Sequence, residues 1–172
     1  LRPAEMLIFN SDGNFFTKTY WRIKFQKNNL QEKDYAKQLH DLLEESMDLR
    51  MVSDVPVGVL LSGGLDSSVI ATIAAKKSKN ELNTYTVGFE DKIDNSYNEL
   101  EESKEMAGIL GTNHHEIIVN SNDAFKLLDK VTLCLDEPFG NPTTTLNYII
   151  SQFASKTSKV VLSGVGGDEM FG

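Results

Sequence analysis

Short apolar segments rich in β-forming residues alternate along this chain with segments of helical periodicity. The predicted strands are 57–61, 84–89, 115–119 and 159–163, and helices are predicted at 31–51, 67–79, 96–110, from 121 onward and at 144–156. A run such as Val57–Leu61 suits a strand buried on both faces, as in a parallel sheet. This alternation predicts an α/β fold, a doubly wound parallel sheet with flanking helices. Ligands of such sheets bind beyond the carboxyl ends of the strands, so the loops after Leu61, Phe89 and Leu162 are the expected site.

Local signals predict several details of the helices. The segment Ser96–Glu99 fits a capping box, and Gly111 is expected to end that helix as its C′ residue. Ser121 or Asn122 is expected to cap the next helix, on whose apolar stripe Cys134 would be a small core residue. In the first helix, the predicted apolar face consists of Leu39, Leu42, Leu43 and Met47.

The charge balance and the cysteine content argue against several classes of protein. The chain has 17 Lys and Arg against 25 Asp and Glu, a formal net charge of −8, which opposes non-specific binding to nucleic acid. Its single cysteine, Cys134, can form no internal disulfide and no cysteine-rich zinc cluster, so a reduced, cytoplasmic location is expected. We expect neither a signal peptide nor a membrane span, because no apolar run approaches the necessary length. Nucleic acid and membranes are therefore not among the expected partners.

The first 30 residues differ from the rest of the chain. They contain the only tryptophan, Trp21, and several other aromatic residues on both sides of Asp12-Gly13, a pattern that predicts a β-hairpin. We interpret residues 1–30 as the end of a preceding domain or a connecting arm, and residues 31–172 as the main domain. The first methionine is Met6, and the chain is expected to begin within a longer protein.

A glycine-containing loop follows the first strand of the main domain and leads directly into a helix. Its sequence is Ser62-Gly63-Gly64-Leu65-Asp66-Ser67-Ser68. The two glycines allow the backbone to approach an anion, and the free N–H groups of the loop and the helix start point toward it. A side chain at Gly63 is expected to stand in the path of that anion, and the serine hydroxyls are expected to donate to it. Neither the Walker pattern nor the dinucleotide pattern fits, and Asp66 beside phosphates requires a divalent cation. The alternative is a glycine turn with capping residues.

A second loop of the same kind follows the last strand. It reads Ser163-Gly164-Val165-Gly166-Gly167-Asp168-Glu169. If the two strands are neighbours in the sheet, Asp66 and Asp168 face one crevice from two loops. Two carboxylates together with nucleotide phosphates are a usual ligand set for Mg²⁺. The alternative is that Asp168 and Glu169 only begin a helix, where acidic residues are favoured.

Five motifs in this order resemble the synthetase domain of glutamine-hydrolysing asparagine synthetases, which are N-type ATP pyrophosphatases. They are the first glycine loop, Tyr85–Phe89, Gly111–Glu116, Asp136-Glu137-Pro138 and the second glycine loop. The resemblance covers roughly residues 20–172 and implies an adenine nucleotide alpha hydrolase-like fold. It implies a ligase that adenylates the side-chain carboxylate of aspartate with ATP, releases pyrophosphate and lets ammonia displace AMP to give asparagine.

The resemblance also implies roles for individual residues. Residues Ser62–Ser68 would hold the pyrophosphate, and Leu61 and Val87 would line the adenosine pocket, Val87 partly through its backbone. Ser163 and Gly164 would contact the nucleotide. Asp66 and Asp168 would bind Mg²⁺ and serve as the catalytic carboxylates. The cofactors would accordingly be ATP and Mg²⁺.

The implied partners are aspartate and ammonia, the ammonia released from glutamine by a glutaminase domain of the same parent chain. That domain would precede Leu1, and a helical region would follow Gly172, so the main domain is expected to be truncated at its C-terminus. A homodimer is left open, as is turnover by the isolated fragment.

Val165 departs from the family pattern, which commonly has an acidic residue at this position, associated with forming the aspartyl-AMP intermediate. Two alternatives therefore stay open. One is the same adenylation of a different carboxylate, as in β-lactam synthetases or other amidotransferases, and the other is an adenine-nucleotide-binding module without turnover. His114 and His115 are adjacent on a predicted strand, so they point to opposite faces and should not share a metal ion. Asp136–Pro138 could lie at the substrate mouth or in a solvated loop.

Overall fold

The computed structural model describes residues 1–25, 29–90, 98–135, 139–141 and 143–171. The chain divides into two compact units, 1–38 and 39–172. None of the helices in the described ranges is long and apolar enough to cross a membrane.

The first unit contains the predicted hairpin. Strands β1 (Glu5–Phe9) and β2 (Phe15–Thr19) pair antiparallel, with Phe9 opposite Phe15. In the turn, Asp12 accepts hydrogen bonds from the backbone N–H (3.1 Å) and the side-chain amide (3.0 Å) of Asn14. Both bonds lower the pKa of the Asp12 carboxyl, and the bond from the backbone N–H has the larger effect. Gly13 has a φ of +87°, a conformation that glycine adopts without strain.

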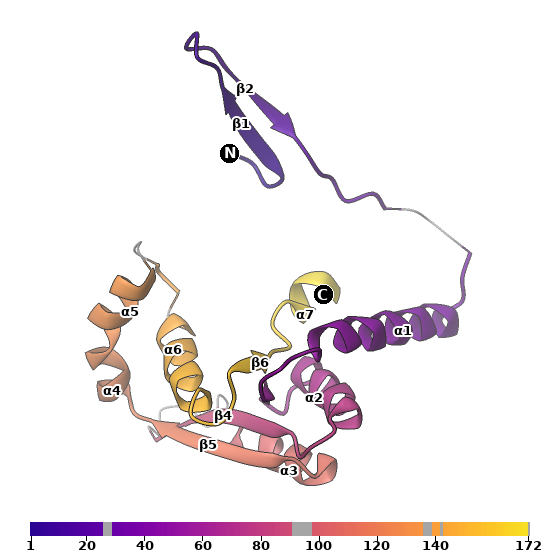
Figure 1. The fold of residues 1–172 in the computed structure, drawn as a ribbon, viewed down its shortest axis with the longest axis vertical. Coiled ribbons are helices and arrows are strands. Elements are labelled where there is room, and N and C mark those ends of the chain that lie inside the picture. Colours follow the sequence, from indigo (N-terminus) through magenta and orange to yellow (C-terminus); the bar gives the residue numbers. More distant parts are fainter. Residues whose placement is uncertain (26–28, 91–97, 136–138, 142, 172) are drawn as a thin grey trace. The chain divides into compact units, whose positions relative to one another are not determined.

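The second unit is built on a parallel sheet of four strands (Figure 1). They are β3 (Val57–Leu60), β4 (Asn83–Phe89), β5 (Asn113–Val119) and β6 (Val160–Leu162). The strand order is β5-β4-β3-β6, so the chain moves outward from β3 to β5 and then returns to place β6 on the other side of β3. This reversal creates a crevice at the carboxyl ends of β3 and β6, the place where such sheets bind ligands.

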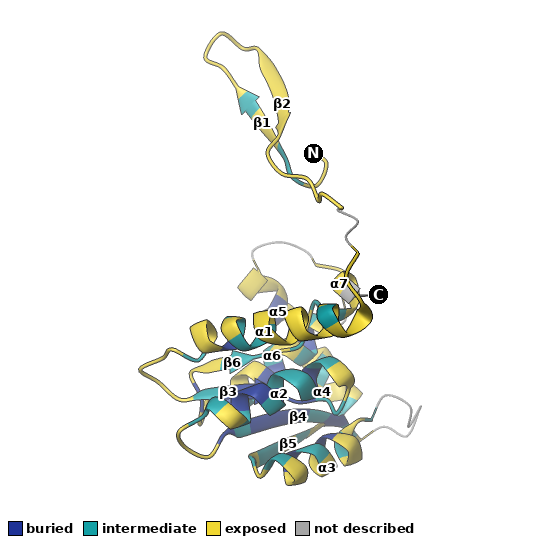
Figure 2. Cartoon of the chain, turned by 90° about the vertical axis from the view of Figure 1, so that its right-hand side faces the viewer, coloured by how far each residue is buried: buried dark blue, intermediate teal, exposed yellow. Residues whose placement is uncertain are grey.

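Helices cover both faces of this sheet. The helices within the described residues are α1 (Glu32–Arg50), α2 (Leu65–Lys77), α3 (Leu100–Leu110), α4 (Ser121–Lys126), α5 (Leu128–Leu135), α6 (Thr143–Ala154) and α7 (Gly167–Phe171). Of these, α2, α3 and α6 pack directly on the strands. Side chains that alternate along the strands enter two separate cores. Toward α1, α2 and α3, the buried core residues are Met47, Val59, Leu61, Ala71, Ile73, Ala74, Leu82 and Ala107. Toward α6, Tyr85 packs against Ile150 and Ala154. Buried residues therefore concentrate in the strands and on the inner sides of the helices (Figure 2), which confirms the predicted fold class.

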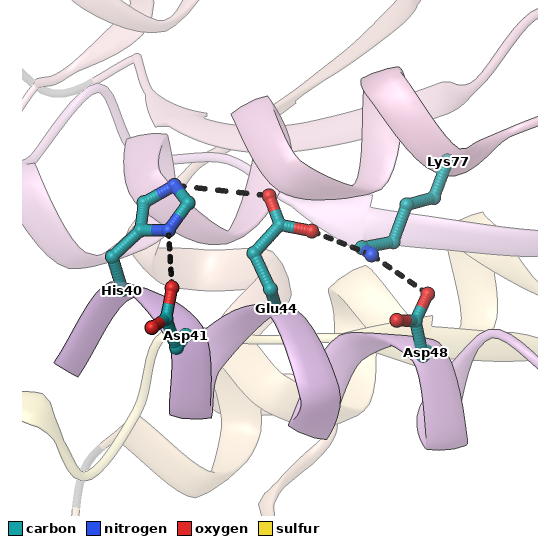
Figure 3. Close-up of polar contacts among 5 residues, drawn as sticks. All are labelled: His40, Asp41, Glu44, Asp48 and Lys77. Carbon is teal, nitrogen blue, oxygen red and sulfur yellow. Dashed lines mark hydrogen bonds and ion pairs between the residues drawn. The ribbon is translucent and has the colours of Figure 1, made fainter. Parts of the chain in front are cut away.

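An ion-pair network joins α1 to α2 (Figure 3). The Lys77 ammonium lies 2.7 Å from Asp48 and 2.5 Å from Glu44, and His40 lies 3.8 Å from the same Glu44. The hydrogen bonds to Asp48 and Glu44 raise the pKa of Lys77, and the bond to Asp48 has the larger effect. The predicted apolar face of α1 is only partly buried, because Met47 is enclosed whereas Leu42 remains 63% exposed.

Helix boundaries differ from the prediction at two places. Helix α3 begins at Leu100, later than the capping box predicts, and Ser96 lies outside the described residues. Its predicted end is confirmed, since Gly111 adopts a left-handed conformation with a φ of +65°. Helix α4 is capped by Asn120, whose side chain accepts a hydrogen bond from the N–H of Asp123. The observed cap therefore lies one residue before Ser121, the earlier of the two predicted caps. An N-cap side chain accepts a hydrogen bond from an N–H two or three residues later, and Asn120 bonds to Asp123 in this way.

The stretch predicted as one helix from residue 121 is divided into α4 and α5. Leu127 separates the two helices, and α5 buries Val131 against the rest of the unit. Cys134 is exposed, so the prediction that it is a core residue is wrong. Cys134 lies in the last turn of α5, where Leu133 and Leu135 are also exposed, so the buried stripe of this helix ends at Val131.

Candidate functional site

The two glycine loops lie against each other at the carboxyl edge of the sheet. Strands β3 and β6 are paired, with Val59 opposite Leu162, so their following loops leave the sheet side by side. The contact leaves no room for a side chain, because a Cβ on Gly164 would lie 2.7 Å from the Ser67 nitrogen. A Cβ on Gly167 would overlap the Asp66 carboxylate. The second loop therefore packs directly on the start of α2.

A cavity of about 490 Å³ opens where the loops meet. Its lining contains most of the predicted site residues, namely Leu61, Ser62, Gly64, Leu65, Asp66, Ser67, Val87, Ser163, Gly164, Val165 and Asp168. Gly63 and Ser68 do not line it. Seven further lining residues are not among the predicted site residues, namely Leu60, Tyr85, Thr86, Glu99, Leu146, Asn147 and Ile150. The structure thus gathers residues from β3, β4, α2, α6 and the segment after β6 around one space.

Hydrogen bonds within the first loop use the serine hydroxyls that were expected to face an anion. The Ser67 hydroxyl donates to the Gly64 carbonyl (3.1 Å) and accepts from the Ser62 N–H (3.2 Å). The Ser62 and Ser67 hydroxyl oxygens are also 2.8 Å apart, and the Gly64 N–H donates to Ser62 (3.3 Å). With their protons used inside the loop, these hydroxyls fix its shape rather than serve as free donors.

Main-chain N–H groups at the start of α2 are also available as donors. Gly64 is the N-cap of α2, and among the described residues no side chain caps this helix end. The Ser68 N–H donates to the Gly64 carbonyl (3.0 Å), which leaves the preceding amides of the first turn without an intrahelical acceptor. These amides and the positive end of the helix dipole favour an anion in the cavity.

Gly63 serves a different purpose from the one expected. Its φ is +81°, and a Cβ there would lie 2.6 Å from the Glu102 Cβ and 2.8 Å from the Ser103 nitrogen. A side chain at this position would therefore collide with α3 rather than stand in the path of an anion. The glycine lets the first loop pack closely against the helix that follows β4.

The second loop places one of its two acidic residues in the cavity. Asp168 and Glu169 both lie in the first turn of α7, as the helix-start interpretation predicts, and Asp168 also lines the cavity. Val165 is 90% exposed, and its N–H donates to the Ser163 hydroxyl (3.2 Å). Val165 accordingly lies at the mouth of the cavity and brings no charge to it.

Glu99 adds a third carboxylate to the lining. It immediately precedes α3, in the segment after β4, and the capping-box interpretation assigned it to the helix rather than to the site. Partial removal from water raises the pKa of Glu99, and the negative charge of Glu102 adds to this effect. The position of this residue beyond the carboxyl end of a parallel strand is the signal that could have identified it.

The carboxylates suit a metal ion that also binds phosphate. No group of three or more His, Cys, Asp or Glu side chains suited to a metal ion occurs within the described ranges. Asp66 and Asp168 line one cavity, and Mg²⁺ is commonly held by one or two carboxylates together with substrate phosphates and water. The donor set therefore fits Mg²⁺ brought by a nucleotide better than a metal centre made by the protein alone.

The two histidines of β5 face opposite sides of the sheet, as predicted. The Nδ1 atom of His114 lies 2.9 Å from the Thr84 hydroxyl, and the Nε2 atom of His115 lies 3.0 Å from the Asn83 side-chain oxygen. His115 stacks on Tyr85, with 5.2 Å between ring centroids. Because the rings lie on opposite faces, they cannot ligate one metal ion together.

Burial lowers the pKa of His114 below its ordinary value of 6.5. The carboxylate of Glu116, 3.6 Å from Nε2, opposes this effect, and the charges of His115 and Lys104 add to it. The folded protein therefore favours the neutral ring, and the unfolded chain binds more protons as the pH falls. The contribution of His114 to the free energy of unfolding is complete above pH 6.5 and is lost as the pH decreases toward the lowered pKa.

Replacing His114 with glutamine should make the free energy of unfolding depend less on pH, because the titrating group is removed. Urea unfolding at about pH 7.5 and about pH 5.5 would measure this, with His40→Gln on exposed α1 as the control. The wild-type protein and His40→Gln should lose more stability over this interval than His114→Gln. An equal loss in all three proteins would contradict the assignment.

The fold and the paired glycine loops define a doubly wound α/β domain with a crevice at the carboxyl edge of its sheet. A family described as asparagine synthase matches residues 38–172. The chain belongs to the asparagine synthase family.

Relatives that match the whole chain include two synthetases. Asparagine synthetase [glutamine-hydrolyzing] 1 of Bacillus subtilis is 33% identical, and the match covers 100% of this chain and 27% of that protein. Putative asparagine synthetase [glutamine-hydrolyzing] 2 of Methanocaldococcus jannaschii is 37% identical, with 100% of this chain and 33% of that protein covered. The chain thus spans a third or less of the length of these relatives.

Solved structures of similar shape include the NH3-dependent NAD synthetase from Campylobacter jejuni. Its TM-score is 0.49 at 14% identity, and the match covers 83% of this chain and 62% of that one. The glutamine-dependent NAD+ synthetase from Acinetobacter baumannii, solved with ADP, also has a TM-score of 0.49, at 16% identity, with 95% and 30% covered.

Proposed function

We propose that this chain is the nucleotide-binding core of an ATP-dependent, amide-forming ligase. It would adenylate the side-chain carboxylate of aspartate, release pyrophosphate and present the adenylate to ammonia, which gives asparagine and AMP. The observation that carries the proposal is the meeting of the two glycine loops, which brings Asp66 and Asp168 to one cavity. Membership of the asparagine synthase family supports the choice of reaction.

The first loop and the start of α2 would hold the phosphates. The amides of the first turn of α2, which have no side-chain cap, would stabilise the charge that develops on pyrophosphate as the α–β bond breaks. Asp66 and Asp168 would hold Mg²⁺, which when bound neutralises phosphate charge. Ser163 and Gly164 would contact the nucleotide from the second loop.

The end of β4 would receive the adenosine. Strand β3 ends at Leu60, the Leu61 N–H donates to the Tyr85 carbonyl (2.9 Å), and the Thr86 hydroxyl donates to the Leu61 carbonyl. Beyond this point β4 continues to Phe89 without a β3 partner, so the main chain of Val87 borders the cavity. Leu61 and Val87 would then line the adenosine pocket, Val87 partly through its backbone.

The rest of the reaction requires parts that would belong to a longer parent protein. Ammonia would come from glutamine through a glutaminase domain, as the names of the relatives suggest. Residues 1–30 would be the end of that domain or a connecting arm, and residues 31–172 the synthetase core. A homodimer and a cytoplasmic location remain predictions.

Exposed Val165 favours a second candidate substrate. An aliphatic side chain at the cavity mouth can neither accept a proton nor pair with a cation, so the group that is adenylated could be a carboxylate other than that of aspartate. The chemistry of adenylation and the residues that hold ATP would be unchanged.

Assaying the parent protein for AMP and pyrophosphate would test both candidates. ATP, Mg²⁺ and ammonia would be supplied with and without aspartate, and Val165→Glu would be compared with the wild-type protein. Aspartate-dependent AMP supports the asparagine synthetase reaction, and AMP formation indifferent to aspartate supports another carboxylate. ATP binding with no AMP under any condition would contradict both and favour a nucleotide-binding module.

A further inference from the structure

The side chain of Tyr85 connects the cavity to the turn that precedes β6. Tyr85 lies in β4 opposite Leu60, the last residue of β3, and lines the cavity from there. Its hydroxyl donates to Ser158 (2.6 Å) and lies 2.7 Å from the hydroxyl of Thr157. Tyr85 and Ser158 are 1% and 3% exposed, so the bond between them is formed away from water. One buried side chain thus contacts both the cavity and the segment that leads into β6.

The packing around Tyr85 fixes the direction of its ring. Gly58 of β3 lies against the ring, where a Cβ would be 2.5 Å from the Cε2 atom of Tyr85 and 2.9 Å from the Ser158 hydroxyl oxygen. The ring also stacks on His115, with 5.2 Å between centroids, and meets Phe153 edge-on at 6.2 Å. A ring enclosed in this way keeps its hydroxyl at a fixed place, because a close-packed interior allows little movement.

Strand β6 is short, so its position depends on the turn before it. It pairs with β3 over three residues and lies at one end of the described strand order. Main-chain hydrogen bonds attach the turn to the end of α6 and, through Lys159 and Pro56 (3.2 Å), to the segment before β3, whereas Tyr85 attaches it to β4. The second glycine loop follows β6 directly and carries Asp168 to the cavity. The position of that carboxylate therefore depends on where the turn is held.

We infer that Tyr85 is a positioning residue, which holds the turn before β6 so that Asp66 and Asp168 face the same metal ion. Asp66 is placed by the first loop and α2, and Asp168 by β6 and the second loop. The relative placement of the two carboxylates therefore depends on how β6 is fixed to the rest of the sheet. Tyr85 makes that connection from β4, the strand that also borders the cavity. The inference rests on the proposed function, because it concerns the Mg²⁺ that ATP would bring.

Tyr85→Phe tests this role, because it removes the hydroxyl and keeps the ring that lines the cavity. In titration calorimetry of the full 172-residue chain with Mg²⁺, the variant should bind ATP about tenfold more weakly than the wild-type chain, the lower end of the loss caused by changes around metal ligands. Without Mg²⁺ the two proteins should bind ATP alike. Equal affinities with Mg²⁺, or a loss of the same size without it, would overturn the role of Tyr85 alone. A wild-type chain that does not bind ATP would overturn the proposed function as well.

Thr84→Val is the matched control. Thr84 precedes Tyr85 in β4 and is equally buried. Its hydroxyl lies 2.9 Å from the Thr112 hydroxyl and 2.9 Å from the Nδ1 atom of His114, on the other face of the sheet. Losing this hydroxyl should lower the free energy of unfolding in urea but leave ATP binding with Mg²⁺ unchanged, because its contacts lead toward β5 rather than β6. The same loss of affinity as in Tyr85→Phe would show that removing any buried hydroxyl of β4 has this effect, and would contradict the inference.

A second variant breaks the same hydrogen bond from the turn. Ser158→Ala removes the acceptor of the Tyr85 hydroxyl and should weaken Mg²⁺-dependent ATP binding by a similar factor, a result that does not require Tyr85→Phe to fold. Combining the two substitutions should cost little more than either one, because both remove one shared interaction. Normal ATP binding by folded Ser158→Ala, or losses that multiply in the double variant, would contradict the connection between Tyr85 and the turn.

Discussion

Replacing Asp66 with asparagine should weaken Mg²⁺-dependent ATP binding by about 100-fold or more, because changes to residues that merely orient metal ligands already cost 10–100-fold. The substitution keeps the size of the side chain, which matters because Gly167 packs directly on this carboxylate. It removes the charge that would hold Mg²⁺ against the phosphates. Titration calorimetry with ATP, in the presence and absence of Mg²⁺, would measure the effect.

Glu169→Gln provides the matched control. Glu169 is exposed and adjacent to Asp168 on α7, yet it does not line the cavity, so its substitution changes the net charge equally without touching the site. It should bind ATP like the wild-type protein. Once Mg²⁺ is chelated, Asp66→Asn and the wild-type protein should no longer differ to this extent. A loss that is independent of Mg²⁺ would show that Asp66 supports the loop rather than a metal ion.

Substituting alanine for Gly63 should lower the free energy of unfolding by about 3 kcal/mol, the sum of backbone strain and forced displacement of a packed neighbour. Its φ of +81° is unfavourable for a residue with a Cβ, and that Cβ would lie 2.8 Å from backbone atoms of Glu102 and Ser103. Urea unfolding would measure the change. ATP binding should weaken as well, because displacing α3 distorts the loop that carries Ser62 and Gly64.

Two other glycines separate the causes of this effect. Gly111 has a φ of +65° and open space around it, so Gly111→Ala should show the cost of backbone strain alone. Gly64 has a φ of −67° and meets only the Ser62 hydroxyl, at 3.3 Å, so Gly64→Ala should be tolerated best. Equal losses in Gly63→Ala and Gly111→Ala would show that contact with α3 costs nothing.

Sequence reasoning located the strands and the two loops because these features depend on local composition. A short apolar run such as Val57–Leu60 followed by glycines is recognisable without its neighbours. Pairing of β3 with β6 was stated only as a condition, since register and strand order depend on how distant segments pack. The structure supplied that pairing and with it the approach of the two loops.

Residues contributed by other elements were harder to identify. Asn147 lies on α6, outside both loops, and the packing of α6 against β4 brings it to the cavity. The sequence suggested that Gly63 makes room for an anion. Its actual contact, with α3, arises from tertiary packing and could not be seen from the local sequence. Likewise, Cys134 was placed in the core because it continues an apolar stripe, whereas in the described part of the chain no other element covers the last turn of α5, which leaves Cys134 and Leu135 exposed.

The three-residue pairing of β6 with β3 has a consequence for how a ligand and the fold depend on each other. Val160–Leu162 bonds to a partner strand that lies far earlier in the chain, and the loop with Asp168 is positioned only while that ladder is intact. Short terminal pairings of this kind open locally at less cost than the whole domain unfolds. A nucleotide that contacts both loops would bind only the paired form, so it would slow hydrogen exchange of the β6 amides in proportion to its concentration. The fraction of protein with nucleotide bound and the fraction with β6 paired to β3 would then report the same equilibrium.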